Sequence, residues 1–306
     1  MKKIILILVL IVLLYGCTNN NDSRDTIENF RTGTGGLSIS FIPNHPPARV
    51  YVRNGEVNEV SIGMNLKNLG AADIIGGALV LSGYDPGILA IPNYRVFNTD
   101  DGLVGRSAFN PQGGFNSFDF NGAVNLAAMG DRYSPNILAT ACYDYSTFTE
   151  LSVCIDPDPY LNKPRACTPS NIASSGQGAP IGVSKVNVEP TKGRTIFQIF
   201  FKNFGKGNVF SSKYGSARCL PNGGGIDERT ELDIIIVRNV KVGNQDITAN
   251  CKGMGWGSVR LNNGENFIYC TYDTQGTDSY QTLLYVEMGY SYRTTTSRSL
   301  EIVKLP

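Results

Sequence analysis

The sequence predicts an all-β protein built from two tandem β-sandwiches, and three observations support this fold class. The 306 residues include 34 glycines, 15 tyrosines and 14 phenylalanines, a composition that favours strands and turns over long helices. Stretches of strand length alternate apolar and polar side chains, with turn residues between them. Two pairs of similar motifs recur in the same order along the chain, which indicates a duplicated domain.

The first residues predict an exported protein with a lipid anchor. Lys2 and Lys3 precede an apolar run, residues 4–14, that is much shorter than the roughly 20 residues of a membrane-spanning helix. Residues 1–16 are therefore expected to be a signal peptide. The sequence LYGC at 14–17 resembles a lipobox, which implies a lipid on Cys17; the alternative is an ordinary signal peptide followed by an incidental cysteine.

Residues 17–35 are polar, and we expect them to form a short disordered stalk that carries the lipid. This arrangement predicts an extracytoplasmic protein on the outer face of the cytoplasmic membrane or on the cell surface. Its membrane partner would be reached through the lipid on Cys17.

The first motif pair predicts one buried-face strand early in each half. VSIGMNLKNLG covers 60–70 and TIFQIFFKNFG covers 195–205. Period-two alternation points one set of side chains in each motif toward a core. These inward residues are Val60, Ile62, Met64 and Leu66 in the first motif, and Phe197, Ile199 and Phe201 in the second.

The second motif pair lies late in each half. CYDYSTFTELSVCI at 142–155 aligns without a gap on GYSYRTTTSRSLEI at 289–302, and a tyrosine pair, Tyr143 and Tyr145, falls on Tyr290 and Tyr292. We expect this motif to be a closing hairpin of each domain, with its turn near Phe148 in the first.

Proline, glycine and serine crowd into the segment between the halves, which is typical of a connector. The predicted domains are therefore 36–156 and 181–306, joined by a linker at 157–180.

The strand ends KNLG at 67–70 and KNFG at 202–205 resemble the second strand of immunoglobulin-like modules of the CARDB and NEW3 type. With the lipobox and six further cysteines, the chain resembles uncharacterised archaeal exported lipoproteins that carry two such modules. The resemblance covers most of the mature chain. It implies two immunoglobulin-like sandwiches in a scaffold or adhesion protein, and it carries over no functional residues.

Charge and cysteine content narrow the function classes. Without Lys2 and Lys3, 25 basic residues face 26 acidic ones, so no basic excess is available to hold nucleic acid. Six cysteines remain besides Cys17, an even number that predicts three disulfides in an exported protein. Because they lack metal-ligand spacing and the chain has one histidine, we expect no metal or cofactor.

Two disulfide schemes are considered. The preferred one takes 142–155 as a hairpin and joins the cysteines at its two ends. Its pairs are Cys142–Cys154, Cys251–Cys270 and Cys167–Cys219. The competing scheme closes the DPDP loop and braces the two domains, with pairs Cys154–Cys167 and Cys142–Cys219.

Few residues suit catalysis. His45, the only histidine, lies between prolines in PNHPPARV, which favours a structural loop over a general base. The carboxylates of NTDDG at 98–102 and IDPDP at 155–159 could bind calcium, but Asp-Gly and Asp-Pro are also ordinary turn pairs. We therefore expect no enzyme, and a hydrolase that uses paired carboxylates remains a third alternative.

The sequence thus favours a non-catalytic, lipid-anchored surface protein that acts as an adhesion module or envelope scaffold and binds a surface protein or glycan. The alternative is a carbohydrate- or solute-binding lipoprotein. Its candidate contacts are Trp256, Tyr94 and Asn222, because exposed aromatic rings stack on sugars and anchor partners. For Trp256 the competing interpretation is a residue that closes one end of a sandwich.

Overall fold

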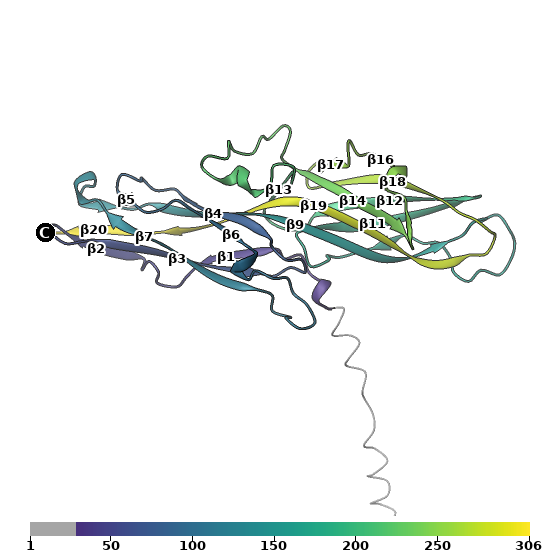
Figure 1. Ribbon diagram of the computed structural model, residues 1–306, viewed down its shortest axis with the longest axis horizontal. Coiled ribbons are helices and arrows are strands. Elements are labelled where there is room, and N and C mark those ends of the chain that lie inside the picture. Colours follow the sequence, from purple (N-terminus) through teal and green to yellow (C-terminus); the bar gives the residue numbers. More distant parts are fainter. Residues whose placement is uncertain (1–28) are drawn as a thin grey trace, which may run out of the picture.

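The computed structural model describes residues 29–306 as an elongated, all-β body with two lobes placed end to end (Figure 1). The predicted all-β class is confirmed. Within this described part, every helical segment is a short 3-10 turn. These turns are η1 (Asn29–Arg31), η2 (Thr99–Asp101), η3 (Leu126–Ala128), η4 (Ser216–Cys219) and η5 (Thr248–Asn250). The signal peptide, Cys17 and most of the predicted stalk lie outside the described residues.

Lobe 1 is a sandwich of two sheets. Its first sheet has the order β1-β3-β7-β5, and its second contains β6, β4 and the first part of β9. The strands are β1 (Leu37–Phe41), β3 (Glu59–Asn68), β4 (Gly76–Ser82), β5 (Leu89–Ala90), β6 (Tyr94–Asn98), β7 (Phe115–Val124) and β9 (Asn136–Ile155).

Lobe 2 repeats this strand order. One sheet runs β10-β11-β12-β18-β16, and the other contains β17, β14 and the first part of β19, with β13 and β15 at its margins. The strands are β10 (Ile172–Ala173), β11 (Ile181–Thr191), β12 (Arg194–Asn203), β13 (Asn208–Phe210), β14 (Ile234–Val242), β15 (Gln245–Asp246), β16 (Cys251–Lys252), β17 (Ser258–Arg260), β18 (Glu265–Asp273) and β19 (Tyr280–Ser299).

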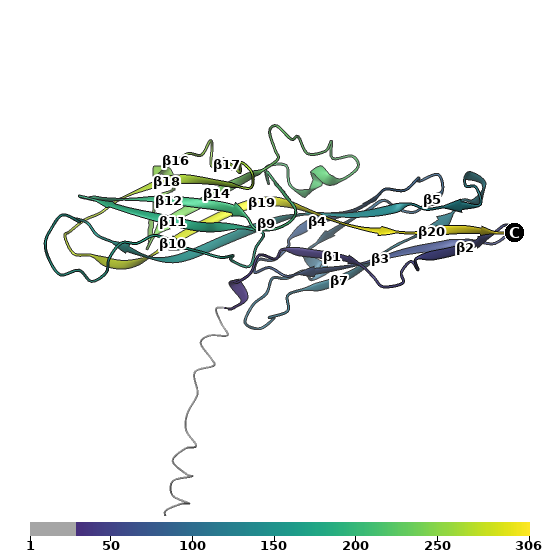
Figure 2. The ribbon, with the colours of Figure 1, turned by 180° about the vertical axis from the view of Figure 1, so that it is seen from behind.

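The lobes exchange strands through β9 and β19. These two strands pair antiparallel over all twenty residues, from Asn136 opposite Ser299 to Ile155 opposite Tyr280. The first part of β9 borders β4 in lobe 1, and its second part continues into lobe 2. β19 borders β14 in lobe 2 and then continues into lobe 1. Figures 1 and 2 show both strands crossing the junction, which we call the waist.

The predicted hairpin turn at Phe148 is therefore wrong. Its segment holds no Gly, Pro, Asn or Asp between Tyr145 and Ile155, and its threonines and aromatic ring favour an extended strand. The inward face simply continues across the waist, where Thr147 and Thr149 are as buried as Tyr145. A straight strand satisfies the same alternation as a hairpin arm.

The C-terminal strand also leaves its predicted domain. β20 (Glu301–Leu305) pairs parallel with β2 (Arg49–Arg53) and antiparallel with β8 (Arg132–Tyr133), at the far end of lobe 1 (Figure 1). The strand pairing therefore does not follow the predicted division into 36–156 and 181–306, because each range sends a strand into the other lobe.

The predicted core is confirmed. The inward residues of both motifs are at most 5% exposed. These residues are Val60, Ile62, Met64, Leu66, Phe197, Ile199 and Phe201.

The motif tyrosines join the strands near the waist by hydrogen bonds. Leu37 donates its backbone N–H to the Tyr143 hydroxyl at 3.0 Å, and Ile181 donates to the Tyr290 hydroxyl at 3.4 Å. The first bond connects β1 of lobe 1 to β9, and the second connects β11 of lobe 2 to β19.

The disulfides follow the competing scheme. Cys142 pairs with Cys219, Cys154 with Cys167, and Cys251 with Cys270. Only the third pair agrees with the preferred scheme, since the predicted pairs Cys142–Cys154 and Cys167–Cys219 are wrong. Cys142 and Cys154 occupy one continuous strand, and twelve residues of extended chain separate them by about 40 Å. No disulfide can span that distance.

Candidate functional site

Trp256 lies at the tip of a tight turn before β17. Gly255 and Ser258 exchange backbone hydrogen bonds of 3.0 and 2.9 Å, and the two residues between them, Trp256 and Gly257, have φ of 54° and 78°. Two central residues with positive φ define a type I′ turn, which favours Asn-Gly. Tryptophan in this position costs roughly 1–2 kcal/mol of backbone strain.

The Trp256 side chain is also fully exposed, with a relative accessibility of 104%. Burying a tryptophan removes about 150–250 Å² of surface from water, which is worth roughly 4–6 kcal/mol. The structure therefore holds a large aromatic ring in water on a strained turn. The interpretation of Trp256 as a residue that closes the sandwich is wrong, and strained, exposed residues of this kind concentrate at binding sites.

Tyr94 occupies the matching position in lobe 1. In lobe 1, Val96 of β6 pairs with Ala78 of β4, which pairs with Cys142. In lobe 2, Ser258 of β17 pairs with Ile236 of β14, which pairs with Gly289, the residue aligned with Cys142. Val96 and Ser258 are therefore equivalent, and two residues before each of them lie Tyr94 and Trp256. Tyr94 is 44% exposed. The predicted contacts thus lie on separate lobes and do not form a single site.

The two lobes differ most in the connection that follows their first motif. In lobe 1 the chain passes directly into β4. In lobe 2 the corresponding strand is interrupted between β13 and β14 by residues 211–233, which we call the insertion loop. Asn222 lies in this loop, is exposed, and does not line the groove beside Trp256.

Three interactions hold the insertion loop in place. The disulfide Cys142–Cys219 ties it to β9. Asp144 of β9 accepts hydrogen bonds from the Ser216 backbone N–H at 2.9 Å and from its hydroxyl at 3.3 Å. The loop is therefore braced against lobe 1 although it belongs to a lobe 2 strand.

The third interaction is an ion pair within the insertion loop itself, between Arg218 and the buried Glu231. Glu231 is 2% exposed, and its Oε1 accepts from Arg218 Nη2 at 2.5 Å and from Nε at 3.1 Å. The Asp227 backbone N–H donates to its other oxygen at 3.2 Å. The Arg218 guanidinium also lies over the Tyr214 ring, 4.5 Å from its centroid. Arg218 thus positions an exposed aromatic side chain.

An open groove of about 710 Å³ lies between the insertion loop and the Trp256 turn. Tyr214 and Lys213 line it from the loop, and Trp256 and Ser258 from the turn. Tyr214 is half exposed, and the Lys213 ammonium lies 5.4 Å from its ring centroid. The groove joins two exposed rings, several hydroxyls and one cation, which suits a flat polar ligand.

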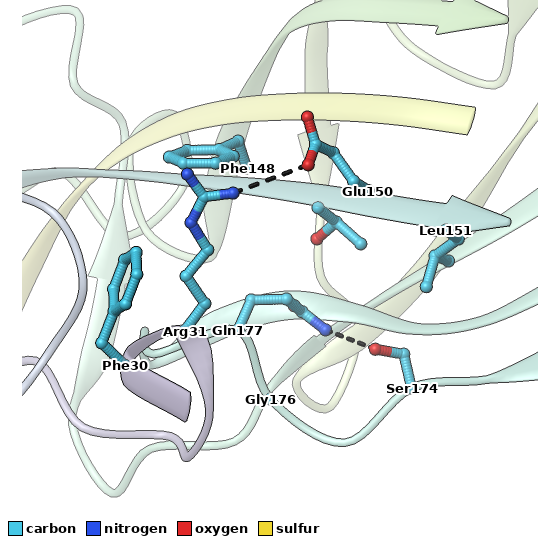
Figure 3. Close-up of a pocket in the computed structure, with 9 residues that line it drawn as sticks. Phe30, Arg31, Phe148, Glu150, Leu151, Ser174, Gly176 and Gln177 are labelled. Atoms are coloured by element: carbon cyan, nitrogen blue, oxygen red, sulfur yellow. Dashed lines mark hydrogen bonds and ion pairs between the residues drawn. The ribbon is translucent and has the colours of Figure 1, made fainter. Parts of the chain in front are cut away.

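A second cavity, of about 420 Å³, lies at the waist (Figure 3). Arg31 lies 4.2 Å over the Phe148 ring, and its Nη1 is 3.6 Å from Glu150 Oε2. Across the cavity, Gln177 donates to Ser174 Oγ at 2.6 Å. The two charged groups in Figure 3 thus pair with each other, and the Gln177 amide pairs with the Ser174 hydroxyl.

One polar atom of this cavity has no partner. Thr149 lines the cavity and is 3% exposed, and its Oγ1 is buried without a hydrogen bond among residues 29–306. The cavity could accept a small ligand with few polar groups.

The candidate calcium loops have structural partners instead. The Asn98 and Asp101 side chains form a reciprocal cap on η2. Asp156 is 1% exposed and accepts from Arg165 Nε at 2.7 Å. Both loops thus use carboxylates as turn and pairing groups, and no cluster of three metal-ligating side chains occurs among residues 29–306.

His45 has a serine and an aspartate beside it, but they are not arranged as a catalytic triad. Ser61 Oγ and Asp119 Oδ1 both approach the same ring nitrogen, Nε2, at 2.9 and 3.4 Å. A triad carboxylate binds the opposite ring nitrogen. Ser61 also donates its hydroxyl hydrogen to Asn121 Oδ1 at 2.5 Å, so His45 donates to Ser61 rather than accepting from it.

Sequence reasoning missed Tyr214, Arg218 and Glu231. The signal that could have found them is the Cys142–Cys219 pair of the competing disulfide scheme, because Arg218 directly precedes Cys219 and a disulfide there indicates an ordered loop. The sequence could not show that the insertion loop lies beside the Trp256 turn, because the two segments come together only when the chain folds.

No protein-family model and no curated protein sequence matches this chain. The solved structures that show weak similarity to this chain include the following two. A secreted serine protease, VesC from Vibrio cholerae, is 12% identical with a TM-score of 0.20, covering 86% of this chain and about half (51%) of that protein. A protein titled pT26-6p is 7% identical with a TM-score of 0.22, covering 94% and 70%. None of the helices described in residues 29–306 is long and apolar enough to cross a membrane.

Proposed function

We propose that this protein is a non-catalytic binding protein of the cell surface, anchored by a lipid on Cys17 and serving as an adhesion module or envelope scaffold. The observation that carries the proposal is the two-lobed body itself. Its lobes share two crossing strands, and a disulfide bridges them through the insertion loop. Such a body holds its surfaces in fixed relative positions, which reduces the entropy lost when a partner binds.

The disulfides indicate an oxidising, extracytoplasmic compartment. The described chain begins with η1 at the waist, drawn in purple in Figure 1. Cys17 lies 12 residues before Asn29, a span of at most about 40 Å of extended chain. A lipid on Cys17 would therefore hold the body by its middle and leave the outer ends of both lobes accessible.

Metabolic labelling tests the anchor. Cells that express the protein are grown with radioactive palmitate, and the membrane fraction is compared between the natural sequence and Cys17→Ser. We expect the natural sequence to carry the label and to stay with the membrane, and Cys17→Ser to do neither. We also expect a membrane-impermeant amine reagent to modify the natural protein on intact cells. An unlabelled protein, or one that the reagent does not reach, would contradict the proposal.

A second candidate function is carbohydrate or solute binding, and the groove beside Trp256 favours it. An exposed ring on a strained turn lines the same groove as a braced tyrosine, and together the two rings offer stacking surfaces. A screen of oligosaccharides by tryptophan fluorescence tests this function directly, because Trp256 is the only tryptophan of the chain. The absence of any saturable change would count against it.

A further inference from the structure

We propose that the groove between Tyr214 and Trp256 binds an acidic saccharide, a chain of pyranose rings that carry carboxylates. The inference rests on the candidate function of carbohydrate binding and names its ligand class. Three features of the groove support it, namely its rings, its charge and its contrast with lobe 1.

Both rings are exposed and are carried by ordered segments. Backbone hydrogen bonds fix the turn that carries Trp256, and the Arg218 guanidinium stacks on the Tyr214 ring and holds it. Arg218 is fixed in turn by buried Glu231. A pyranose has a flat face of C–H groups that packs on an aromatic ring, and rings that are already ordered lose little entropy when they bind.

Polar groups surround these rings. Ser212, Thr230 and Ser258 line the groove and can donate to or accept from sugar hydroxyls. The groove of about 710 Å³ is large enough for more than one sugar ring.

The charge of the groove selects an acidic ligand. Lys213 is the single charged residue among those that line the groove, and no carboxylate lines it. Arg218, which stacks on the Tyr214 ring, is not among the lining residues and is neutralised by Glu231. A carboxylate on the sugar would therefore meet an exposed, uncompensated ammonium, whereas a cationic ligand would be repelled.

Lobe 1 serves as an internal comparison. Tyr94 occupies the position that corresponds to Trp256, but lobe 1 has no loop corresponding to 211–233. It therefore has no second ring and no cation facing Tyr94 from such a loop. The binding groove is expected in lobe 2 alone.

Fluorescence titration of the purified, oxidised protein tests the proposal. The probes are trigalacturonate and its fully methyl-esterified form, which has the same rings without charge. We expect a saturable change in Trp256 emission with trigalacturonate and weaker binding of the ester. Lys213→Gln should lower affinity for the acid by about two- to fivefold at low salt and leave the ester unchanged. Tyr214→Ala should weaken binding of both by about tenfold.

Two variants use the other lobe as the matched control. Tyr94→Ala should bind with unchanged affinity. In the double variant Tyr94→Trp, Trp256→Phe, the single tryptophan moves to lobe 1 and its emission should not respond to the acid. Calorimetry of each variant shows whether binding itself persists, and thermal melting shows that the variant is folded.

The outcomes separate the two levels of the proposal. Equal binding of acid and ester would overturn the acidic ligand while leaving carbohydrate binding in place. A response of neither probe at millimolar concentration would overturn the proposed groove ligand. An equal loss of affinity in Tyr94→Ala and Tyr214→Ala would show that the groove is not the site. The surface anchor is tested separately by Cys17 labelling, so its failure cannot be confused with these results.

Discussion

Replacing Asn68 with alanine should destabilise the protein by about 3 kcal/mol. Asn68 ends the first motif strand and is completely buried. Its Nδ2 donates to the carbonyl oxygens of Ala72 at 2.8 Å and Leu103 at 3.0 Å, and its Oδ1 accepts from the Gly70 N–H at 3.0 Å. Its Oδ1 also accepts a longer bond from the Tyr145 hydroxyl at 3.5 Å. Alanine removes these four hydrogen bonds, of which the three shorter ones are each worth about 1 kcal/mol net, and leaves buried backbone groups unpaired.

Asn203 gives the matched comparison in lobe 2. It makes the same kinds of contact, donating to Gly207 O at 3.0 Å and accepting from Gly205 N–H at 3.1 Å and the Tyr292 hydroxyl at 3.2 Å. Asn203 is partly exposed, so water can replace some of these bonds. We expect Asn203→Ala to cost about 1.5 kcal/mol.

Equilibrium unfolding in urea, followed by circular dichroism with the disulfides oxidised, measures both values. The exposed Asn222→Ala serves as a control and should stay within about 0.5 kcal/mol of the natural sequence. If Asn68→Ala costs less than Asn203→Ala, or no more than the control, the reasoning from burial and hydrogen bonding is refuted. Because the lobes share strands, one transition is expected for all variants.

Three further outcomes are expected. Residues 157–306 expressed alone should not melt cooperatively, because they lack the part of β9 that completes lobe 2; a sharp melt of this fragment would contradict the strand exchange. Removing the Cys142–Cys219 bridge by Cys219→Ser with Cys142→Ser should leave the fold intact but expose the insertion loop to limited proteolysis, and unchanged cleavage would show that the bridge does not hold the loop. Burial raises the pKa of Tyr280 from 10.0 to about 12, so the folded state keeps a proton that the unfolded chain releases. The contribution of Tyr280 to the free energy of unfolding should therefore be fully present below pH 10 and be lost as the pH rises through about 12. Urea unfolding at each pH, with tyrosinate absorbance, measures it, and a free energy of unfolding that does not fall over this range would refute the expectation.

The alternation of apolar residues determined much of the fold from the sequence alone. Period-two patterns at 60–70 and 195–205 identified strands whose inward residues are buried, because a strand next to a core must send alternate side chains into it. The even cysteine count outside Cys17 likewise indicated three disulfides, since exported proteins oxidise their thiols.

Tertiary structure alone decided how these strands connect. A hairpin and a strand that crosses the waist place the same residues of 142–155 inward, so the local pattern cannot distinguish them. Only the pairing of β9 with β19 over twenty residues does so. The disulfide pairs followed from that choice, because a hairpin would bring Cys142 and Cys154 together and a straight strand separates them. The groove was likewise beyond the sequence, since Tyr214 and Trp256 lie 42 positions apart in the chain and line one groove only in the folded protein, where the insertion loop is fastened to β9.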